Sequence, residues 1–411
     1  MEPTLIIFTA VALFGYALVS KRLATTPISG PMVFVGLGVA GYAFGLFDDF
    51  PVTGSGLAEV LELTLALLLF TDATKVHVRS WDASMDLPTR LLTIGMPLTI
   101  VLGTLAATLV FPTIGLVSAA LIATILAPTD AALGQAVVTN PSVPTRIREA
   151  LGIESGLNDG IALPIILFLI TLGEAEEGYT LWGLFAEGIG FGVLVGVGFG
   201  AGAALALGVA KRRSWIAPVW VRISVVAVAF ATFLVADAMG GSGFIAAYVG
   251  GNVFGRVIDP IDHTSSEFGE YLGIVLTMIS FLIFGAFILA PNLSVFTAST
   301  IVYAVLSLTA IRMVPVAISM IGREFRPPTV LYLGWFGPRG LASIIFAGLL
   351  VEEAGLAGSE IIVAAVVVTV TLSVVLHGAT APWSSNRYAA WVASQTAAAD
   401  GTPPAPAAAD G

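Results

Sequence analysis

Thirteen apolar segments, most of them about 20 residues long, run through residue 383 of this chain. A helix of about 20 apolar residues crosses the hydrocarbon core of a bilayer, which is about 30 Å thick. Of the 411 residues, 57% are hydrophobic and only 11% are charged, so a soluble fold would expose one continuous apolar surface. We therefore predict an all-α polytopic membrane protein with 13 transmembrane helices. The expected segments lie near 3–20, 28–47, 57–73, 88–111, 113–135, 150–172, 181–210, 217–238, 241–256, 267–290, 298–321, 329–352 and 359–382.

The basic residues indicate how these segments are oriented. Lysine and arginine concentrate in cytoplasmic loops. With the N-terminus outside, nearly all of them fall in inner connections, Arg312 lies in the inner half of a segment, and only Arg339 is left mid-segment. The outer loops hold acids such as Asp48 and Glu174 instead. The sequence thus predicts a multi-pass protein of the cell membrane with an external N-terminus and a cytoplasmic C-terminus.

Two stretches depart from the regular pattern of spans. The ninth segment is short, and its Gly241-Ser242-Gly243 start allows a broken or re-entrant helix. Residues 384–411 are rich in Ala, Pro and Gly, a composition that buries no core. We expect them to form a disordered cytoplasmic tail after a transmembrane domain of residues 1–383.

Glycine and proline interrupt two segments at membrane depth. Ala127-Pro128-Thr129-Asp130 lies in the fifth segment, and GWFGPRG, from Gly334 to Gly340, lies in the twelfth. The two segments are seven apart, an odd number, so they run in opposite directions, as in an inverted repeat. Broken helices at matching positions of two halves point to the binding site of a transporter. Ordinary proline kinks in a packed bundle are the alternative.

Asp159 is the acid that most needs an explanation. It lies about ten residues into the sixth segment, about 15 Å deep and close to the bilayer midplane. An acid at that depth costs roughly 2.5 to 3.5 kcal/mol and is a functional candidate by default. Ser155 is four residues earlier, on the same helix face, and its hydroxyl adds an oxygen ligand suited to a hard cation. Glu154 and Asn158 form a second polar stripe, turned away from the first.

Asp130 has two open interpretations. It neutralises the paired N-termini of two half-helices, or it contacts a cation directly together with Thr129 and the unwound carbonyl groups. Arg339 is expected to offset the paired C-termini. It is also the natural partner of Glu154 in a buried ion pair, because no other buried cation is unassigned.

These residues predict an exchange mechanism. Burial away from water disfavours the charged form of a carboxyl group, so near neutral pH it holds either a proton or a monovalent cation. Competition for one site moves one ion out and the other in. With Asn158 beside Asp159 and Glu154 neutralised, one carboxylate titrates per cycle, which predicts electroneutral 1:1 exchange.

At this point the sequence resembles the monovalent cation:proton antiporters of the NhaP/NHE type. The resemblance implies an NhaA-like inverted repeat with two crossing discontinuous helices, in segments five and twelve. It also implies a homodimer in which a core domain, from about 88–172 and 298–382, moves like an elevator against a dimerisation domain, from about 1–75 and 181–290. The matching motifs are APTDAALG at Ala127, IESGLNDG at Ile153, GSGFIAAYVGGNVFG at Gly241, GWFGPRGLASIIFA at Gly334 and, more faintly, LLLFTDATKV near Asp72.

The resemblance also implies roles for single residues. Asp159 binds the ion and the proton, and an Asn-Asp pair such as Asn158-Asp159 marks electroneutral members. One departure is Ala131, where many members have proline after the Thr-Asp pair. The other implied ion ligands are Thr129, Asp130 and Ser155, and the implied stabilising cluster is Glu154, Asn158 and Arg339.

The expected function is therefore transport rather than enzyme catalysis, in the service of pH homeostasis. We expect exchange of Na⁺ or Li⁺ for H⁺ without a cofactor or nucleic acid, with K⁺ as the alternative cation. A cation channel is the rival from another class, because broken helices and acids also line pores. A rhomboid-like protease with a Ser242–His377 dyad is a weaker rival, since it leaves Asp130 and Asp159 unexplained.

Overall fold

The computed structural model describes residues 3–24, 26–47, 55–74, 86–174, 181–258, 265–353 and 358–399, and within these ranges it contains helices and no strands. Helical residues occur in each of the thirteen predicted segments. The α-helices are α1 (Pro3–Leu23), α2 (Gly30–Ala43), α3 (Ser55–Thr74), α4 (Asp86–Arg90), α5 (Met96–Val110), α6 (Leu116–Ile125), α7 (Ala131–Val138), α8 (Thr145–Glu174), α9 (Leu181–Arg212), α10 (Pro218–Ala238), α11 (Gly243–Ile258), α12 (Glu267–Ile283), α13 (Ala298–Leu308), α14 (Ala310–Ser319), α15 (Pro327–Trp335), α16 (Leu341–Glu353) and α17 (Ser359–Ala399). Short π- and 3₁₀-helical stretches lie at Leu91–Gly95, Phe284–Leu289 and Ala290–Val295.

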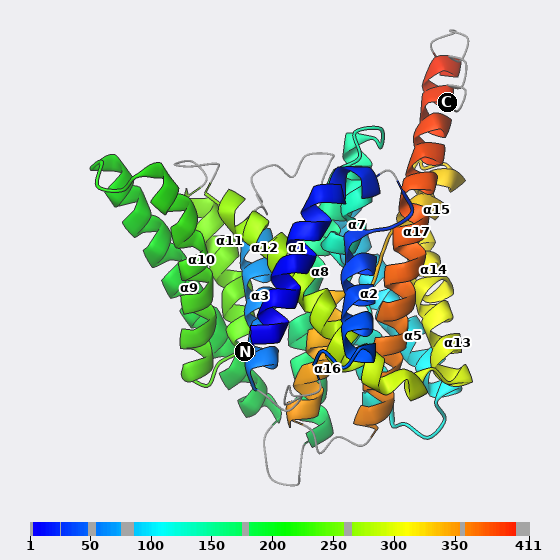
Figure 1. The fold of residues 1–411 in the computed structure, drawn as a ribbon, viewed down its shortest axis with the longest axis horizontal. Helices are drawn as coiled ribbons and strands as arrows, with labels where there is room; N and C mark the ends of the chain where they lie inside the picture. The colour runs from blue at the N-terminus through cyan, green and yellow to red at the C-terminus, as the bar shows by residue number, and fades with distance from the viewer. Residues whose placement is uncertain are drawn as a thin grey trace.

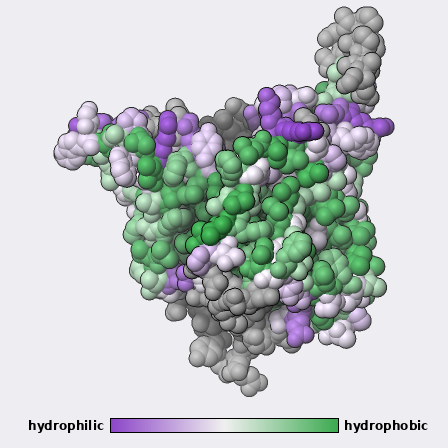
Figure 2. Space-filling model, viewed as in Figure 1, coloured by the Kyte–Doolittle hydropathy of each residue, from purple (hydrophilic) through white to green (hydrophobic). Residues whose placement is uncertain are grey.

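The outer surface of the bundle is that of a membrane protein. Within the described ranges, eight helical stretches are long and apolar enough to cross a bilayer, and three shorter apolar helices accompany them. Figure 2 shows a broad hydrophobic band across the visible face, with hydrophilic residues gathered along its upper and lower edges. The prediction of an all-helical, multi-pass membrane protein is confirmed at this level.

The helices form an elongated bundle (Figure 1). Helices α9, α10 and α11 lie at one end, α5, α13 and α14 lie at the other, and α1, α3 and α8 lie between them. Helix α11 packs against both α9 and α3. A Cβ atom built on Gly251 would lie 2.2 Å from the carbonyl oxygen of Phe70, and one on Gly255 would lie 2.3 Å from that of Thr74. The glycines of α11 therefore bring helix backbones together.

The same contacts correct the prediction for the ninth segment. Helix α11 is continuous from Gly243 to Ile258, with no break or re-entrant turn. Ser242 accepts a hydrogen bond from the backbone N–H of Ile245 at 3.3 Å, so the Gly-Ser-Gly start is a helix cap. Its glycine content reflects close packing rather than unwinding.

The predicted disordered tail is wrong for residues 384–399, because α17 continues through Ala399. Aromatic packing against α15 accounts for the extension. The ring of Tyr388 stacks on that of Tyr332 at 4.2 Å, and the Tyr332 hydroxyl lies 2.9 Å from the hydroxyl of Ser385. The remainder of the predicted tail, 400–411, lies outside the described residues.

Candidate functional site

Two interrupted helices meet in the interior. Helix α6 ends at Ile125 and α7 begins at Ala131, while α15 ends at Trp335 and α16 begins at Leu341. Pro128 and Pro338 have no backbone N–H, so neither continues a helical hydrogen-bond ladder. The backbone N–H of Asp130 donates to the carbonyl of Pro338 at 2.8 Å, which holds the two unwound segments against each other.

The Asp130 carboxylate caps two helices at once. Oδ1 accepts from the N–H of Leu133 in α7 at 3.1 Å, and Oδ2 accepts from the N–H of Leu341 in α16 at 2.7 Å. A Cβ atom built on Gly340 would lie 1.8 Å from Oδ2, so only glycine leaves room for this contact. These are the contacts that the helix-end interpretation of Asp130 requires. Direct contact between Asp130 and a cation stays a prediction.

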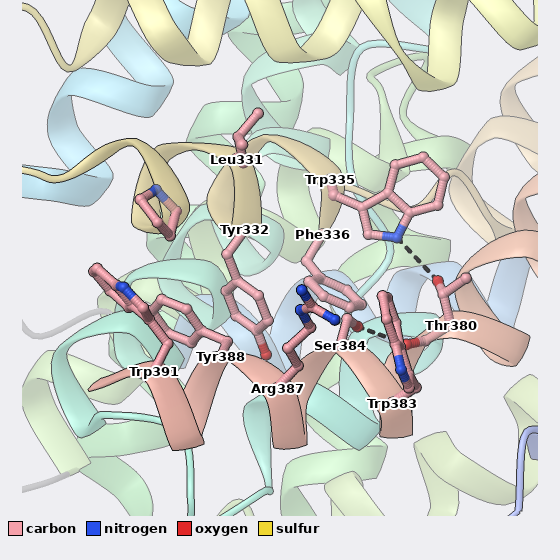
Figure 3. A pocket seen from close by; sticks show the side chains of 11 residues that line it. Leu331, Tyr332, Trp335, Phe336, Thr380, Trp383, Ser384, Arg387, Tyr388 and Trp391 are labelled. Carbon is pink, nitrogen blue, oxygen red and sulfur yellow. Dashed lines mark hydrogen bonds between the residues drawn. The ribbon is translucent and has the colours of Figure 1, made fainter. Parts of the chain in front are cut away.

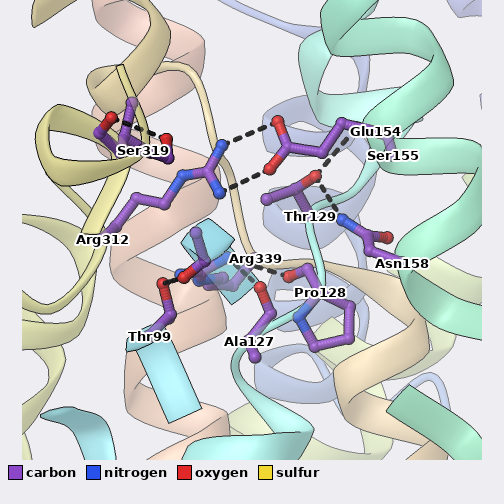
Figure 4. Close-up of polar contacts among 12 residues, drawn as sticks. Thr99, Ala127, Pro128, Thr129, Glu154, Ser155, Asn158, Arg312, Ser319 and Arg339 are labelled. Atoms are coloured by element: carbon purple, nitrogen blue, oxygen red, sulfur yellow. Dashed lines mark hydrogen bonds and ion pairs between the residues drawn. The ribbon is translucent and has the colours of Figure 1, made fainter. Parts of the chain in front are cut away.

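Arg339 lies against the part of the first unwound segment that directly follows α6. Its side chain is fully buried, and Nη1 donates to the carbonyls of Ala127 at 2.6 Å and Pro128 at 3.0 Å (Figure 4). Those carbonyls follow the C-terminal end of α6, where a positive charge is favourable. Arg339 thus makes contacts of the kind expected from a cation that offsets helix C-termini.

The predicted ion pair between Glu154 and Arg339 is wrong. Glu154 pairs with Arg312 instead, through two hydrogen bonds of 2.6 Å and 2.8 Å (Figure 4). Arg312 reaches inward because Gly337 has no side chain: a Cβ atom built there would lie 2.4 Å from Nε of Arg312. Sequence reasoning missed this residue because it placed Arg312 near the inner surface. The feature of the sequence that could have indicated its role is that Arg312 is a single arginine within an apolar segment.

Thr129 joins the unwound segment to α8. Its hydroxyl lies 2.9 Å from that of Ser155 and accepts a hydrogen bond from Nδ2 of Asn158 at 2.7 Å. Thr129 and Asn158 are each only 2% exposed. Asn158 therefore converges with Ser155 on Thr129, contrary to the prediction that the two belong to separate polar stripes.

Asp159 lies near the middle of α8 and is half-buried. Its Oδ1 is fully buried and has no hydrogen-bond partner among the residues that the structure describes. Asp130 and Asp72 are the acids whose charges act on it. Gly156, one turn before Asp159, faces α3, since a Cβ atom built on it would lie in ordinary contact, 3.4 Å, from Cβ of Asp72.

Within the described ranges, no group of three or more His, Cys, Asp or Glu side chains is arranged to hold a metal ion. The oxygen atoms at this site come from hydroxyl and amide groups as well as from carboxylates. The cation-binding roles of Asp159, Asp130, Ser155 and Thr129 stay predictions.

His377 belongs to the support of this site. It is 1% exposed, and Nε2 lies 2.9 Å from the carbonyl oxygen of Trp335, so Nε2 is the donor. Nδ1 lies 3.1 Å from the hydroxyl of Ser373, which accepts from the N–H of Arg339 at 2.7 Å. Helix α17 therefore holds both ends of the second unwound segment. Ser242 caps α11, whereas His377 contacts Ser373 and Trp335. The rival Ser242–His377 dyad therefore does not form.

A family model described as "Sodium/hydrogen exchanger, transmembrane" matches residues 9–386. The chain belongs to the sodium/hydrogen exchanger family. The predicted kinship is thereby confirmed, and so is the prediction that the chain is not an enzyme, since the exchangers are secondary transporters.

This chain shares about a quarter of its residues with two curated relatives. It is 24% identical over 397 residues to "K(+)/H(+) antiporter NhaP2" from Shewanella baltica (strain OS223), covering 89% of this chain and 65% of that protein. It is 25% identical over 336 residues to "K(+)/H(+) antiporter NhaP" from Alkalimonas amylolytica, covering 80% of this chain and 56% of that protein. The chain therefore spans less than two thirds of the length of these curated relatives.

Solved structures share its fold. One structure of the sodium proton antiporter MjNhaP1 from Methanocaldococcus jannaschii, at pH 8, gives a TM-score of 0.70 at 20% identity and covers 91% of this chain and 98% of that chain. A second MjNhaP1 structure, from an electron microscopy map, gives a TM-score of 0.73 at 20% identity and covers 94% of this chain. The interrupted helices thus belong to a fold that occurs in a known antiporter.

Proposed function

We propose that this exchanger is a secondary active transporter that moves a monovalent cation against H⁺ across the cell membrane, with Asp159 binding either ion. The observation that carries the proposal is the buried Oδ1 of Asp159, which has no hydrogen-bond partner among the described residues. A buried polar atom without a partner costs free energy. Binding of a proton or a cation at that oxygen removes this cost, so the two ions compete for one position.

The neighbours of Asp159 supply the remaining ligands in this proposal. Thr129 and Ser155 present hydroxyl oxygens 2.9 Å apart, and Asp130 contributes charge from the unwound segment. Oxygen ligands suit hard monovalent cations. Asn158, through its bond to Thr129, and Arg339, through its bonds to the carbonyls after α6, hold the ligands in place. Glu154 supports the site from its pair with Arg312.

We further propose electroneutral 1:1 exchange. Glu154 is neutralised by Arg312, and Asn158 is uncharged, so neither adds a second titrating group beside Asp159. Na⁺ or Li⁺ is the proposed cation. K⁺ is the alternative, favoured by the relatives at 24% and 25% identity that carry the name K(+)/H(+) antiporter.

The proposed architecture has thirteen spans in an NhaA-like inverted repeat, with the N-terminus outside. The α6–α7 and α15–α16 interruptions form its two crossing discontinuous helices, which is supported by the hydrogen bond between Asp130 and Pro338. A core of about 88–172 and 298–382 moves against a dimerisation domain of about 1–75 and 181–290. The partner is a second copy of the chain in a homodimer. The shared fold with MjNhaP1 supports this arrangement.

Proteoliposomes with a trapped pH dye test the activity at clamped voltage. Addition of Na⁺, Li⁺ or K⁺ should collapse an acid-inside gradient, and Asp159→Asn should abolish the response. Asp237→Asn, the same change at an exposed aspartate on α10, should leave it intact. A response that Asp159→Asn retains at the wild-type rate would reject Asp159 as the exchange site. A pH gradient whose dissipation depends on the membrane voltage would reject exchange in favour of a channel.

A further inference from the structure

A second site lies between α15 and the C-terminal part of α17. It is a pocket of about 590 Å³, and none of Thr129, Ser155 and Asp159 lines it. Aromatic rings from both helices form most of its wall (Figure 3). They belong to Tyr332, Trp335, Phe336, Trp383, Tyr388 and Trp391. The rings of Tyr388 and Trp391 stack at 5.8 Å, which extends the Tyr332–Tyr388 stack along α17. Such a wall accommodates an apolar chain.

The lining of this pocket carries a positive charge and no negative one. Arg387 is the only charged residue of the lining, and its side chain extends from α17 toward α15 (Figure 3). The guanidinium lies 5.5 Å from the ring centre of Trp383, and no carboxylate in the described part of the chain pairs with it. At the start of α15, two residues before Pro328 of the lining, Arg326 donates a hydrogen bond to the neutral side chain of Gln395. An anion with an apolar body complements this combination.

The depth of the pocket matches one leaflet of a bilayer. Ser373 is bonded to the unwound segment that carries Arg339, and we take this level as the midplane. At 1.5 Å per residue, Thr380 is then about 10 Å and Arg387 about 20 Å from the midplane. The hydrocarbon ends at about 15 Å and the headgroup layer at about 20 to 22 Å. The pocket therefore runs from acyl-chain depth to phosphate depth, with Arg387 at the phosphate level.

The pocket is also open toward lipid. Trp383 is 63% exposed and Leu331 is 58% exposed, and both line it. Tryptophan and arginine at the edge of the hydrocarbon commonly anchor a protein to the interface. Here the exposed ring and the cation flank a cavity rather than a flat surface, so the walls would contact an occupant on more than one side.

We propose that this pocket binds one anionic phospholipid of the leaflet on the C-terminal side, with its phosphate on Arg387 and an acyl chain along the aromatic wall. A free phosphate would make the first contact and not the second. A zwitterionic lipid would bring its own cation toward Arg387 and Arg326, which disfavours it. The site is independent of the exchange activity proposed above.

Native mass spectrometry of the delipidated full-length protein tests the proposal by titration with phosphatidylglycerol and, separately, phosphatidylcholine. One phosphatidylglycerol should bind at least tenfold more tightly than phosphatidylcholine. Arg387→Gln should weaken phosphatidylglycerol binding about tenfold, because a charge-assisted hydrogen bond is lost. Arg387→Lys should recover most of the affinity. Trp383→Ala should weaken both lipids, and its exposed position keeps this variant folded.

Arg213→Gln is the matched control, because Arg213 also lies over a tryptophan ring, 4.7 Å from that of Trp215, but lines no part of this pocket. It should bind phosphatidylglycerol like the wild type. Equal losses in Arg213→Gln and Arg387→Gln would overturn the proposal. So would competition by inorganic phosphate at the lipid's own concentration, or equal affinity for the two lipids. A tenfold gain in affinity on truncation after Ala399 would assign the groove to the chain's own end and also overturn it.

Discussion

Arg312 donates two hydrogen bonds to the carboxylate of Glu154, which lies 158 positions away in the sequence, at 2.6 Å and 2.8 Å. Both side chains are only 2% exposed. The pair ties α14 to α8 at the level of Thr129. Each charge is compensated chiefly by the other, because burial leaves almost no side-chain surface for solvation by water.

Arg312→Met is therefore expected to lower the stability of the folded protein by about 3–5 kcal/mol, since Glu154 is left as an uncompensated buried charge. The double variant Arg312→Met/Glu154→Leu should recover a large part of the loss. Thermal unfolding in detergent measures both. Arg323→Met is the control: Arg323 pairs with Asp86 at the surface, where such a pair contributes less than about 1 kcal/mol. Similar losses in Arg312→Met and Arg323→Met would contradict the assignment.

Gly340→Ala should disable exchange by displacing Asp130. The new Cβ atom would lie 1.8 Å from Oδ2, so the carboxylate must leave the N–H of Leu341. A lost helix cap costs about 1–2 kcal/mol, which corresponds to roughly a tenfold change in the population of the competent site. The initial rate of cation-dependent pH change in everted vesicles reports the effect. Gly348→Ala, on the same helix with nothing within 4 Å of the new atom, should behave like the wild type.

Thr129→Val tests the link between the unwound segment and α8. Valine has nearly the shape of threonine but no hydroxyl group, so Nδ2 of Asn158 loses its acceptor. A buried donor without a partner costs roughly 1–3 kcal/mol. We expect a higher KM for the cation, because a ligand and the position of Asn158 are both lost. Thr129→Ser should keep KM near the wild-type value. An unchanged KM in Thr129→Val would show that this hydroxyl plays no part in binding.

The sequence predicted the features that depend on a single segment. Hydropathy located the helices, and Pro128, Pro338 and the neighbouring glycines located the two interruptions, because helix formation and its failure are local. Depth along a helix placed Asp159 in the middle of α8 for the same reason. The family resemblance had implied one ion site for Thr129 and Ser155, and their hydroxyl groups do lie 2.9 Å apart.

Partners across helices were less predictable. Depth and helix face do not predict whether Arg312 or Arg339 pairs with Glu154. The sequence suggested that the Arg312 side chain extends toward the inner surface. Its helix is broken at Thr309, where φ is −117° and ψ is −96°, and the following helix α14 carries Arg312 inward. The supporting role of His377 was not visible in the sequence either, since it depends on the carbonyl group of Trp335 in α15. The helical end of α17 was missed because composition does not reveal the stack on Tyr332.

Competition at Asp159 predicts a specific dependence of KM on pH. If one carboxylate holds either one proton or one cation, protonation removes cation sites one for one. In the pH range where the site is mostly protonated, apparent KM for the cation should therefore rise about tenfold for each unit that the pH falls, by simple mass action. Above that range KM should be constant, because the carboxylate is already ionised. Proteoliposomes assayed at several pH values, with the voltage held at zero, give the slope of log KM against pH. A slope of about −1 supports one proton per cation, whereas a slope near −2 would require a second titrating group.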